Sequence, residues 1–350
     1  MKTVFIVGAG ASKEVKLPVG SELKKSIAQA LSMEFDHFDP LPIRGDRKIA
    51  EAFYAAVRTV DPRSNNIKPF TEAAWHIREA MPQSTSIDNF IDSQGGDKYI
   101  QLCGKLAIVQ TILQEEGKSD LFINDTKPDH RIDFERLGNT WFRHFENLLT
   151  DSCKVNDLRN RLRSIVFIIF NYDRCIEHYL YHAIQNYYRL TVSDTVQSLR
   201  NLEICHPYGS AGSLPWQGRD NATPFGAQPN ARQLLQLASE IKTFSEGTDE
   251  SLSYVEAIRS HMETANNLVF LGFAFHRLNM SLLLPQMDNP SKDLSARRHI
   301  YATAHGISNS NVDVITEGRS DLFLSQSMLW MAEHQWEARH GSTDLRRCQL

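Results

Sequence analysis

The sequence predicts an α/β fold in which a Rossmann-like parallel sheet carries a large helical segment after its first strand. Short apolar runs rich in β-branched residues recur along the chain, and segments with helical apolar spacing separate them. The first run leads directly into glycines, as at a sharp turn from a buried strand into a helix. Strands that alternate with helices favour a parallel, doubly wound sheet.

The first predicted strand is Thr3–Val7, which is apolar or β-branched throughout, as in a strand buried on both faces. The other predicted strands cover residues 164–170 (SIVFIIF), 202–205, 267–271 and 299–302. About 155 residues of mostly helical pattern separate the first two strands, far more than a crossover needs. We therefore expect a core of residues 1–21 and 160–310, with a helical insertion at residues 22–159.

Three other segments have a distinct character. Residues 84–93 (STSIDNFIDS) predict a helix start with Ser86 as N-cap, and residues 117–130 form a polar break between helices. Residues 209–230 are rich in Gly, Pro and Asn, and we expect this long loop to cover a cleft. In the tail, residues 311–350, apolar residues recur at helical spacing and predict helix, packed on the core or against a partner.

Composition limits the classes of function. The 350 residues are 41% hydrophobic, which suffices for a proper core, and the net charge of -4 gives no general attraction to nucleic acid or anionic membranes. The five cysteines are scattered, odd in number and never spaced as C-x-x-C, so neither a disulfide framework nor a zinc ribbon is indicated, and a reducing compartment is favoured. The longest apolar run is far shorter than the roughly 20 residues of a membrane helix. We expect a cytoplasmic protein that binds neither membrane nor nucleic acid directly.

Polar or glycine-rich residues follow each predicted strand. In open α/β sheets ligands bind beyond the carboxyl ends of the strands. The strand ends here carry GAGAS (8–12), NYD (171–173), HPYGS (206–210), GFAF (272–275) and HG (305–306). The glycine pair predicts a phosphate-binding turn, but Lys13 stands where the dinucleotide fingerprint has its third glycine. A tight turn without a ligand is the alternative.

In this order the motifs GAGAS with LPVG (17–20), FNYD, HPYGS and LGFAF resemble the sirtuin-like NAD-consuming proteins, specifically their bacterial anti-phage branch. The resemblance covers residues 3–21 and 160–310. It implies an NAD⁺ glycohydrolase that releases nicotinamide and ADP-ribose and depletes NAD as an effector of abortive infection. NAD is then the substrate, and no metal is expected.

The resemblance also assigns roles to residues. Asn171 lies near the nicotinamide ribose, Asp173 holds the nicotinamide carboxamide, and His206 contacts the ribose hydroxyls and acts as base. These three are the predicted catalytic residues. The predicted NAD-binding residues are Gly8, Ala9, Gly10, Ser12, Pro18, Asn171, Asp173, Gly272, Phe273 and Thr303.

The chemistry of these residue types agrees with the assigned roles. Nicotinamide leaves NAD⁺ as a neutral molecule through an oxocarbenium-like sugar, so the site must supply positioning and charge stabilisation. An amide orients water, a carboxylate accepts from the leaving group and an imidazole takes a proton. Each residue also has a structural alternative: Asn171 and Asp173 as helix caps, His206 as a structural hydrogen-bonder, and Gly272 as a close-packing position.

The chain departs from the classical deacylating members of that family. It lacks their four-cysteine zinc module, and Val19-Gly20-Ser21 follows Pro18 where they have aspartate, phenylalanine and arginine. Water is therefore favoured over an acyl-lysine as the acceptor. An NAD or ADP-ribose sensor without turnover and an NAD-dependent deacylase remain the alternatives. The resemblance further implies a sensor or activator partner such as a HerA-type ATPase, and a homo-oligomer.

Overall fold

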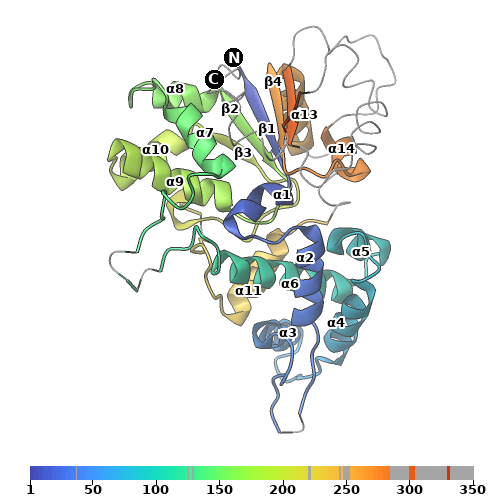
Figure 1. Cartoon of the computed structure of the whole chain (residues 1–350). Coiled ribbons are helices and arrows are strands. Elements are labelled where there is room, and N and C mark those ends of the chain that lie inside the picture. The colour runs from blue at the N-terminus through green and yellow to red at the C-terminus, as the bar shows by residue number, and fades with distance from the viewer. Residues whose placement is uncertain are drawn as a thin grey trace.

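A computed structural model describes residues 1–36, 38–124, 126–127, 130–219, 222–243, 246, 253–283, 299–303 and 329–331. The chain has two parts, a sheet flanked by helices and a lobe made only of helices (Figure 1). The short helix α1 (Ala9–Ser12) lies where the two parts meet. The residues that follow β1 are thus placed between the sheet and the helical lobe.

The sheet is parallel throughout, with the strand order β3-β2-β1-β4-β5-β6. Its strands are β1 (Thr3–Val7), β2 (Ile165–Ile169), β3 (Glu203–Cys205), β4 (Asn267–Leu271), β5 (His299–Thr303) and β6 (Leu329–Met331). In the centre, Thr3 pairs with Ile165 on one side and Asn267 on the other. This is the Rossmann order, and it reverses between β1 and β4, where such sheets bind ligands. The predicted Rossmann-like parallel sheet and all five predicted strands are confirmed.

Side chains alternate between two cores along each central strand. In β1, Val4 and Ile6 face one core, whereas Phe5 and Val7 face the other, because successive side chains of a strand point to opposite sides. Helices α7 (Trp141–Thr150), α8 (Leu158–Arg163), α9 (Cys175–Tyr188) and α10 (Val192–Leu199) cover the second core. Phe145 of α7 packs edge-on against Phe5 and Phe167 there. Helices α13 (Ser253–Thr264) and α14 (Arg277–Leu283) lie on the opposite face.

The helical lobe holds α2 (Gly20–Ala30), α3 (Arg47–Val60), α4 (Lys68–Ala80), α5 (Ile87–Ser93), α6 (Lys98–Glu116) and α11 (Ala231–Glu240). Helix α6 runs through its middle and is buried along most of its length. The lobe does not coincide with residues 22–159. α11 packs on α3 and α6 from beyond that range, whereas α7 and α8 within it bury their apolar faces on the sheet.

Local sequence signals hold at several helix ends. Ser86 is the N-cap of α5, and its hydroxyl accepts from the N–H of Asn89 at 3.1 Å, as predicted. Asp46, Asp97, Thr140 and Asn230 cap other helices in the same way. The predicted polar break at residues 117–130 falls between α6 and α7, as expected. Of the helices that the structure describes, none has both the length and the apolar composition that a membrane span requires.

The tail is the place where the helix prediction is wrong in part. Leu329–Met331 forms strand β6 and pairs with Tyr301–Thr303 of β5. An unpaired strand edge offers backbone donors and acceptors, and pairing with them outweighs the helical spacing of three apolar residues. The remainder of the predicted helical tail, 311–328 and 332–350, lies outside the described residues, as do His305 and Gly306.

Candidate functional site

The side chain of Asn171 joins the ends of two strands. It follows β2, is only 6% exposed, and its Nδ2 donates to the carbonyl of Gly8 at 3.1 Å and to Ser12 Oγ at 3.2 Å. Gly8 and Ser12 follow β1, the neighbouring strand. The amide is thus held against the glycine turn, and the helix-cap alternative is not what these hydrogen bonds show.

His206 lies directly after β3 and contacts both Asn171 and a residue that the sequence analysis did not identify. Its Nδ1 is 3.2 Å from the backbone oxygen of Asn171, and its Nε2 is 2.6 Å from Oε1 of Glu177. Because both partners are acceptors, this arrangement is that of an imidazolium, which donates from both nitrogens. Burial lowers the pKa of His206, but the Glu177 carboxylate and the Asn171 carbonyl together raise the pKa above its ordinary value.

Glu177 stands in the first turn of α9, four residues after Asp173. Its side chain is 4% exposed, and its second oxygen, Oε2, is buried without a hydrogen-bond partner among the described residues. A buried carboxylate oxygen without a donor is costly. An acidic residue shortly after FNYD was the available sequence signal, but nothing in the pattern indicated that it faces His206.

Asp173 lies in the strand-end region, as predicted, and it also acts as a helix cap, which was the structural alternative for this residue. Its Oδ1 accepts from the backbone N–H of Cys175 at 3.1 Å, so it caps the start of α9. Burial raises the pKa of Asp173, although the hydrogen bonds from Cys175 and from the Ser12 side chain lower it in part. The same Ser12 hydroxyl accepts from Asn171, so one short network links Asn171, Ser12 and Asp173.

The glycines at the ends of β1 and β4 are required by close packing. Gly272 has φ +54°, and a Cβ there would lie 2.0 Å from the nitrogen of Ala11, while a Cβ on Gly8 would lie 2.5 Å from the oxygen of Gly272. The N–H of Gly8 donates to Leu271 and that of Gly10 to Gly272. These two N–H groups are therefore engaged with β4, and contact of this turn with a phosphate stays a prediction.

The other predicted NAD-binding residues occupy different surroundings. Thr303 ends β5, and its hydroxyl accepts from the N–H of Gly272 at 2.8 Å, which links it to the glycine turns. Phe273 is buried among Phe170, Phe270 and Phe275. Ala9 begins α1 and is half-buried, and Pro18 is half-buried in the segment before α2. The hydrogen bonds of the described residues link Pro18 to none of the strand-end side chains.

A buried ion pair fixes the helical lobe to this region. Arg174, next to Asp173, is 1% exposed and Glu116 at the end of α6 is fully buried; Nε of Arg174 lies 3.0 Å from Oε1 of Glu116. The guanidinium also donates to the carbonyls of Thr223 and Pro224 in the 209–230 loop. Both ions thus have several partners, as a buried pair needs.

The 209–230 loop packs against α9 and the residue after Asn171. The ring of Phe225 stacks on His178 with centroids 4.2 Å apart, and Trp216 stacks on Tyr181 at 5.5 Å. The N–H of Ala211 donates to the carbonyl of Tyr172 at 2.9 Å. Residues 220 and 221 lie outside the described part. The loop therefore lies beside the strand ends, and whether it covers a cleft there stays a prediction.

Tyr172 links the strand ends to α5 of the helical lobe. Its hydroxyl donates to Oδ1 of Asp88. Burial raises the pKa of Asp88 to about 6, although the hydrogen bond from Tyr172 lowers it in part. The neighbouring Tyr208 donates to Asn279 of α14 at 2.7 Å. The aromatic residues beside Asn171 and His206 thus tether both flanking parts of the molecule.

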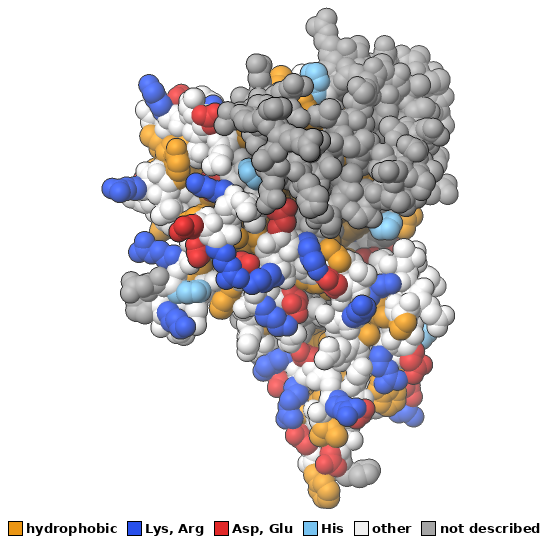
Figure 2. All heavy atoms as spheres, in the orientation of Figure 1, with side chains coloured by type: hydrophobic (Ala, Val, Ile, Leu, Met, Phe, Trp, Pro, Cys, Tyr) orange, Lys and Arg blue, Asp and Glu red, His pale blue; other side chains and the backbone are white. Residues whose placement is uncertain are grey.

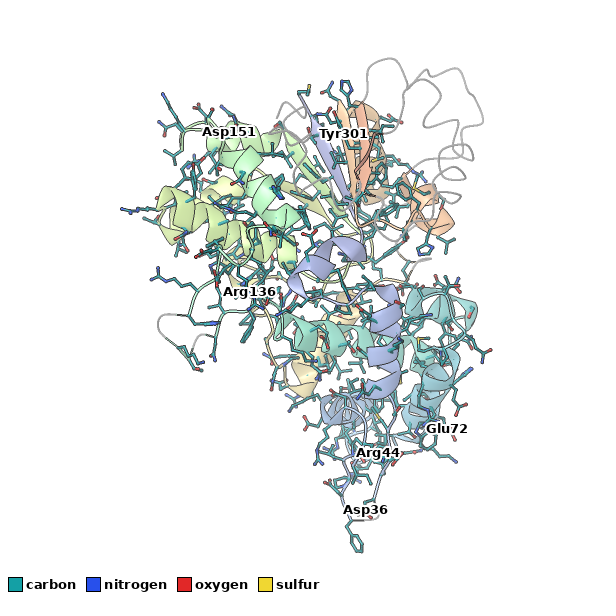
Figure 3. All side chains as sticks on the ribbon, viewed as in Figure 1. Asp36, Arg44, Glu72, Arg136, Asp151 and Tyr301 are labelled. Atoms are coloured by element: carbon teal, nitrogen blue, oxygen red, sulfur yellow. The ribbon has the colours of Figure 1, made fainter. Side chains whose placement is uncertain are left out.

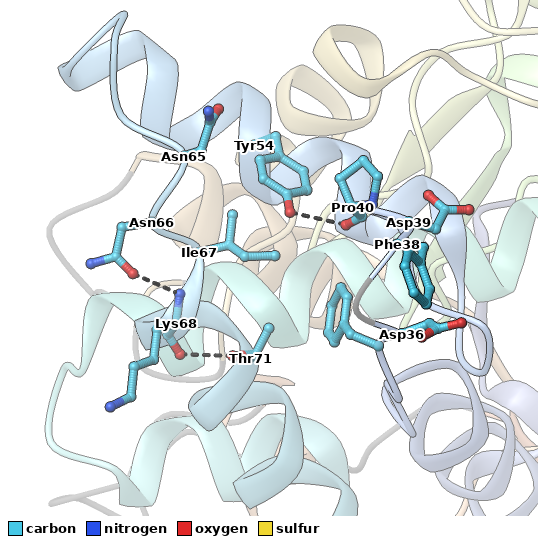
Figure 4. Close-up of a pocket in the computed structure, with 11 residues that line it drawn as sticks. Asp36, Phe38, Asp39, Pro40, Tyr54, Asn65, Asn66, Ile67, Lys68 and Thr71 are labelled. Carbon is cyan, nitrogen blue, oxygen red and sulfur yellow. Dashed lines mark hydrogen bonds between the residues drawn. The ribbon is translucent and has the colours of Figure 1, made fainter.

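Two grooves lie elsewhere, in the helical lobe. One of about 570 Å³ opens between the 35–40 loop, α3 and the start of α4, as Figure 4 shows. The other, of about 1030 Å³, lies between α3 and α11. Neither is lined by a residue that directly follows a strand. The residues that line the first are Phe35, Asp36, Phe38, Asp39, Pro40, Tyr54, Asn65, Asn66, Ile67, Lys68 and Thr71.

The surface of the helical lobe carries mixed charge. On the face seen in Figure 2, the described acidic and basic side chains are interspersed over this lobe. The tip of the lobe, marked by Asp36 and Arg44 in Figure 3, lies far from the sheet. On this face, therefore, the described side chains do not form the single-sign stripe that a nucleic-acid interface requires.

The strand-end residues thus form one connected group, which we call the strand-end cluster: Gly8, Gly10, Ser12, Asn171, Asp173, Glu177, His206 and Gly272. No protein-family model matches this chain, and a search of curated proteins found no match for it.

Proposed function

We propose that this chain is an NAD⁺ glycohydrolase, which releases nicotinamide and ADP-ribose and serves as an NAD-depleting effector in bacterial anti-phage defence. The contiguity of Ser12, Asn171 and His206 carries the proposal. These residues come from three adjacent strand ends of a sheet with the dinucleotide-binding strand order. The order of the motifs along the chain resembles that of sirtuin-like NAD-consuming proteins, and this resemblance is the reason for proposing NAD⁺ as the substrate.

The charges of the cluster favour this chemistry. Cleavage of the nicotinamide bond develops positive charge on the sugar, and NAD⁺ itself carries a cationic ring. Asp173 and Glu177 place two buried carboxyl groups beside Asn171 and His206. Once His206 has lost a ring proton, its charge no longer neutralises Glu177, and fixed negative charge beside the sugar then stabilises the oxocarbenium-like transition state more than the ground state.

The residues divide the task as follows. Asn171 is held by Gly8 and Ser12, so its amide has a fixed orientation from which to position water. Asp173 accepts from the carboxamide of the leaving group. The unpartnered Oε2 of Glu177 accepts from a ribose hydroxyl, which supplies the missing donor. His206 takes up the proton of the nucleophile only after it loses one of its own ring protons, because both ring nitrogens face acceptors.

That last requirement also favours an alternative, a sensor that binds NAD⁺ or ADP-ribose without turnover. With His206 held between Glu177 and the Asn171 carbonyl, the cluster presents no free base. In the glycohydrolase proposal, the protonated His206 is freed from these two acceptors when the chain is activated in the cytoplasm. The activator is a sensor protein such as a HerA-type ATPase, or assembly into a homo-oligomer.

The test is incubation of the purified chain with NAD⁺, alone and with the products of neighbouring genes, followed by detection of nicotinamide. Asn171→Ala and His206→Ala are expected to lower turnover by about a hundredfold or more and to retain most of the binding. Binding without nicotinamide under all conditions supports the sensor instead. Turnover that appears only with an acylated peptide supports a deacylase.

A further inference from the structure

A second group of chemically active side chains lies on the edge strand, one residue before His206. Glu203 and Cys205 alternate with Ile204 along β3, so their side chains share one face of the strand. His261 of α13 lies over that face. One donor atom from each of the three side chains lies within 4.8 Å of the other two.

The imidazole of His261 is incompletely satisfied. Its Nε2 is buried and has no hydrogen-bond partner among the described residues, although Oε1 of Glu203 lies only 2.8 Å away. The two atoms are therefore close without the alignment of donor and acceptor. Two ligands of one metal ion would have this relationship once Nε2 has given up its proton, because both lone pairs would then point to the ion and not to each other.

We propose that Glu203, Cys205 and His261 form a binding site for a divalent transition metal, with zinc as the best match. The donors are a carboxylate oxygen, a thiolate sulfur and an imidazole nitrogen, a mixed set that suits zinc and excludes magnesium and calcium. Zinc bonds of about 2.0–2.3 Å place neighbouring ligands roughly 3.3–3.7 Å apart. His261 Nε2 and Glu203 Oε1 lie 2.8 Å apart, below this range, and all three donor atoms lie within 4.8 Å of one another, so side-chain movements of about an ångström suffice.

The site has access to solvent and an open coordination position. The Glu203 side chain is 53% exposed, whereas that of His261 is 14% exposed, so the ion enters from the carboxylate side. Three protein ligands leave the fourth tetrahedral position to water. The metal would fasten α13 to β3 next to His206. It takes no part in the proposed NAD⁺ chemistry, for which no metal is expected.

Lys2 is the built-in competitor for this metal. Its Nζ lies 2.7 Å from Nδ1 of His261 and donates to Thr264 Oγ1 at 2.9 Å. An ammonium group only donates, so Nδ1 is the acceptor and Nε2 carries the ring proton while this contact holds. Coordination through Nε2 requires this single ring proton to move to Nδ1, which then no longer accepts from Lys2, so Lys2 must withdraw. The thiol of Cys205 loses its proton to solvent in the same step.

The test is titration of the full-length, chelator-treated protein with Co²⁺ alone, a spectroscopic substitute for zinc. We expect one equivalent to bind with a thiolate-to-cobalt charge-transfer absorption, and Zn²⁺ to displace it. Cys205→Ser abolishes this absorption, whereas Cys153→Ser, which alters a buried cysteine outside the site, retains it. Glu203→Gln, at an exposed position, weakens binding by about tenfold or more, as loss of even an outer partner of a metal does.

Lys2→Met separates this metal site from an ordinary ion-pair cluster. Removal of the competing ammonium is expected to tighten Co²⁺ binding about tenfold or more. Thermal unfolding without metal verifies that each variant is folded. The proposal is wrong if Co²⁺ does not bind with a sulfur charge-transfer band, if that band survives in Cys205→Ser, or if Lys2→Met weakens binding. These outcomes are independent of whether the chain cleaves NAD⁺.

Discussion

His206 and Glu177 form an ion pair in which Nε2 lies 2.6 Å from Oε1, and this pair sets the charge of the predicted base. Burial lowers the pKa of His206 and the Glu177 carboxylate raises it, and the net result is a raised pKa. The ring proton is therefore retained to a higher pH than on an ordinary histidine, because its pKa is raised. A side chain in this state donates hydrogen bonds and does not accept a proton.

Glu177→Gln is expected to lower the pKa of His206, because only the Asn171 carbonyl and the Asp173 carboxyl then oppose the effect of burial. Histidine NMR titration measures this shift, with His206→Gln to assign the resonance and the exposed Glu72→Gln as control. If the chain cleaves NAD⁺ with neutral His206 as base, the rising limb of the rate against pH moves to lower pH in the variant. An unchanged His206 titration contradicts the ion pair.

The pair Glu116–Arg174 is expected to be essential for stability. Both side chains are fully buried, so Glu116→Gln leaves the Arg174 charge uncompensated and costs about 3–5 kcal/mol of the free energy of unfolding. Glu72→Gln is the matched control, since Glu72 pairs with Lys68 at 3.7 Å on the surface of α4 (Figure 3). The control is expected to cost less than about 1 kcal/mol. Urea unfolding measures both, and equal losses would contradict the prediction.

Gly272→Ala is expected to destabilise the junction of β1 and β4 strongly. A Cβ at Gly272 meets the backbone of Ala11 at 2.0 Å, so the two turns must separate. Gly95→Ala provides the control, because Gly95 also has positive φ, +63°, but has open space around it. The control is expected to cost about 1–2 kcal/mol from backbone strain alone, and Gly272→Ala clearly more. Equal losses in thermal or urea unfolding would show that the close approach of the turns is unimportant.

The sequence predicted those parts of the molecule in which the local pattern of apolar residues matches the burial that the fold imposes on them. Continuous apolar runs such as Thr3–Val7 are buried on both faces in the sheet, and the residues after them meet at one edge because parallel strands end together. Asn171 and His206 were therefore predictable as neighbours. The contact that joins them, through the Asn171 backbone oxygen, was not.

The remaining features depend on long-range packing. Glu177 and Glu116 lie on helices, where a carboxylate is ordinarily solvated, and only the positions of His206 and Arg174 in the fold make them buried partners. Likewise α11 carries an ordinary amphipathic pattern, which does not specify that it joins the helical lobe. Strand β6 has three residues, too few for any period to be recognised.

Burial of Asp88, which accepts a hydrogen bond from Tyr172, makes the contact between sheet and helical lobe dependent on pH. Asp88 has a pKa of about 6 in the folded chain, against 3.8 for an ordinary aspartate, because burial disfavours its charged form. A folded-state pKa above the unfolded value means that the folded chain holds the proton more tightly. The stability that this proton confers is complete below about pH 4 and is lost as pH rises through 6, by at most about 3 kcal/mol.

Asp88→Asn is expected to remove this dependence, because the amide oxygen still accepts from Tyr172 and carries no charge. Urea unfolding of the native chain and the variant at several pH values between 4 and 7 measures the difference in the free energy of unfolding. That difference should change in favour of the variant as pH rises, while Glu72→Gln accounts for the loss of an exposed carboxylate. A constant difference across this range would mean that Asp88 titrates as an ordinary aspartate, and that the lobe contact does not respond to pH through this residue.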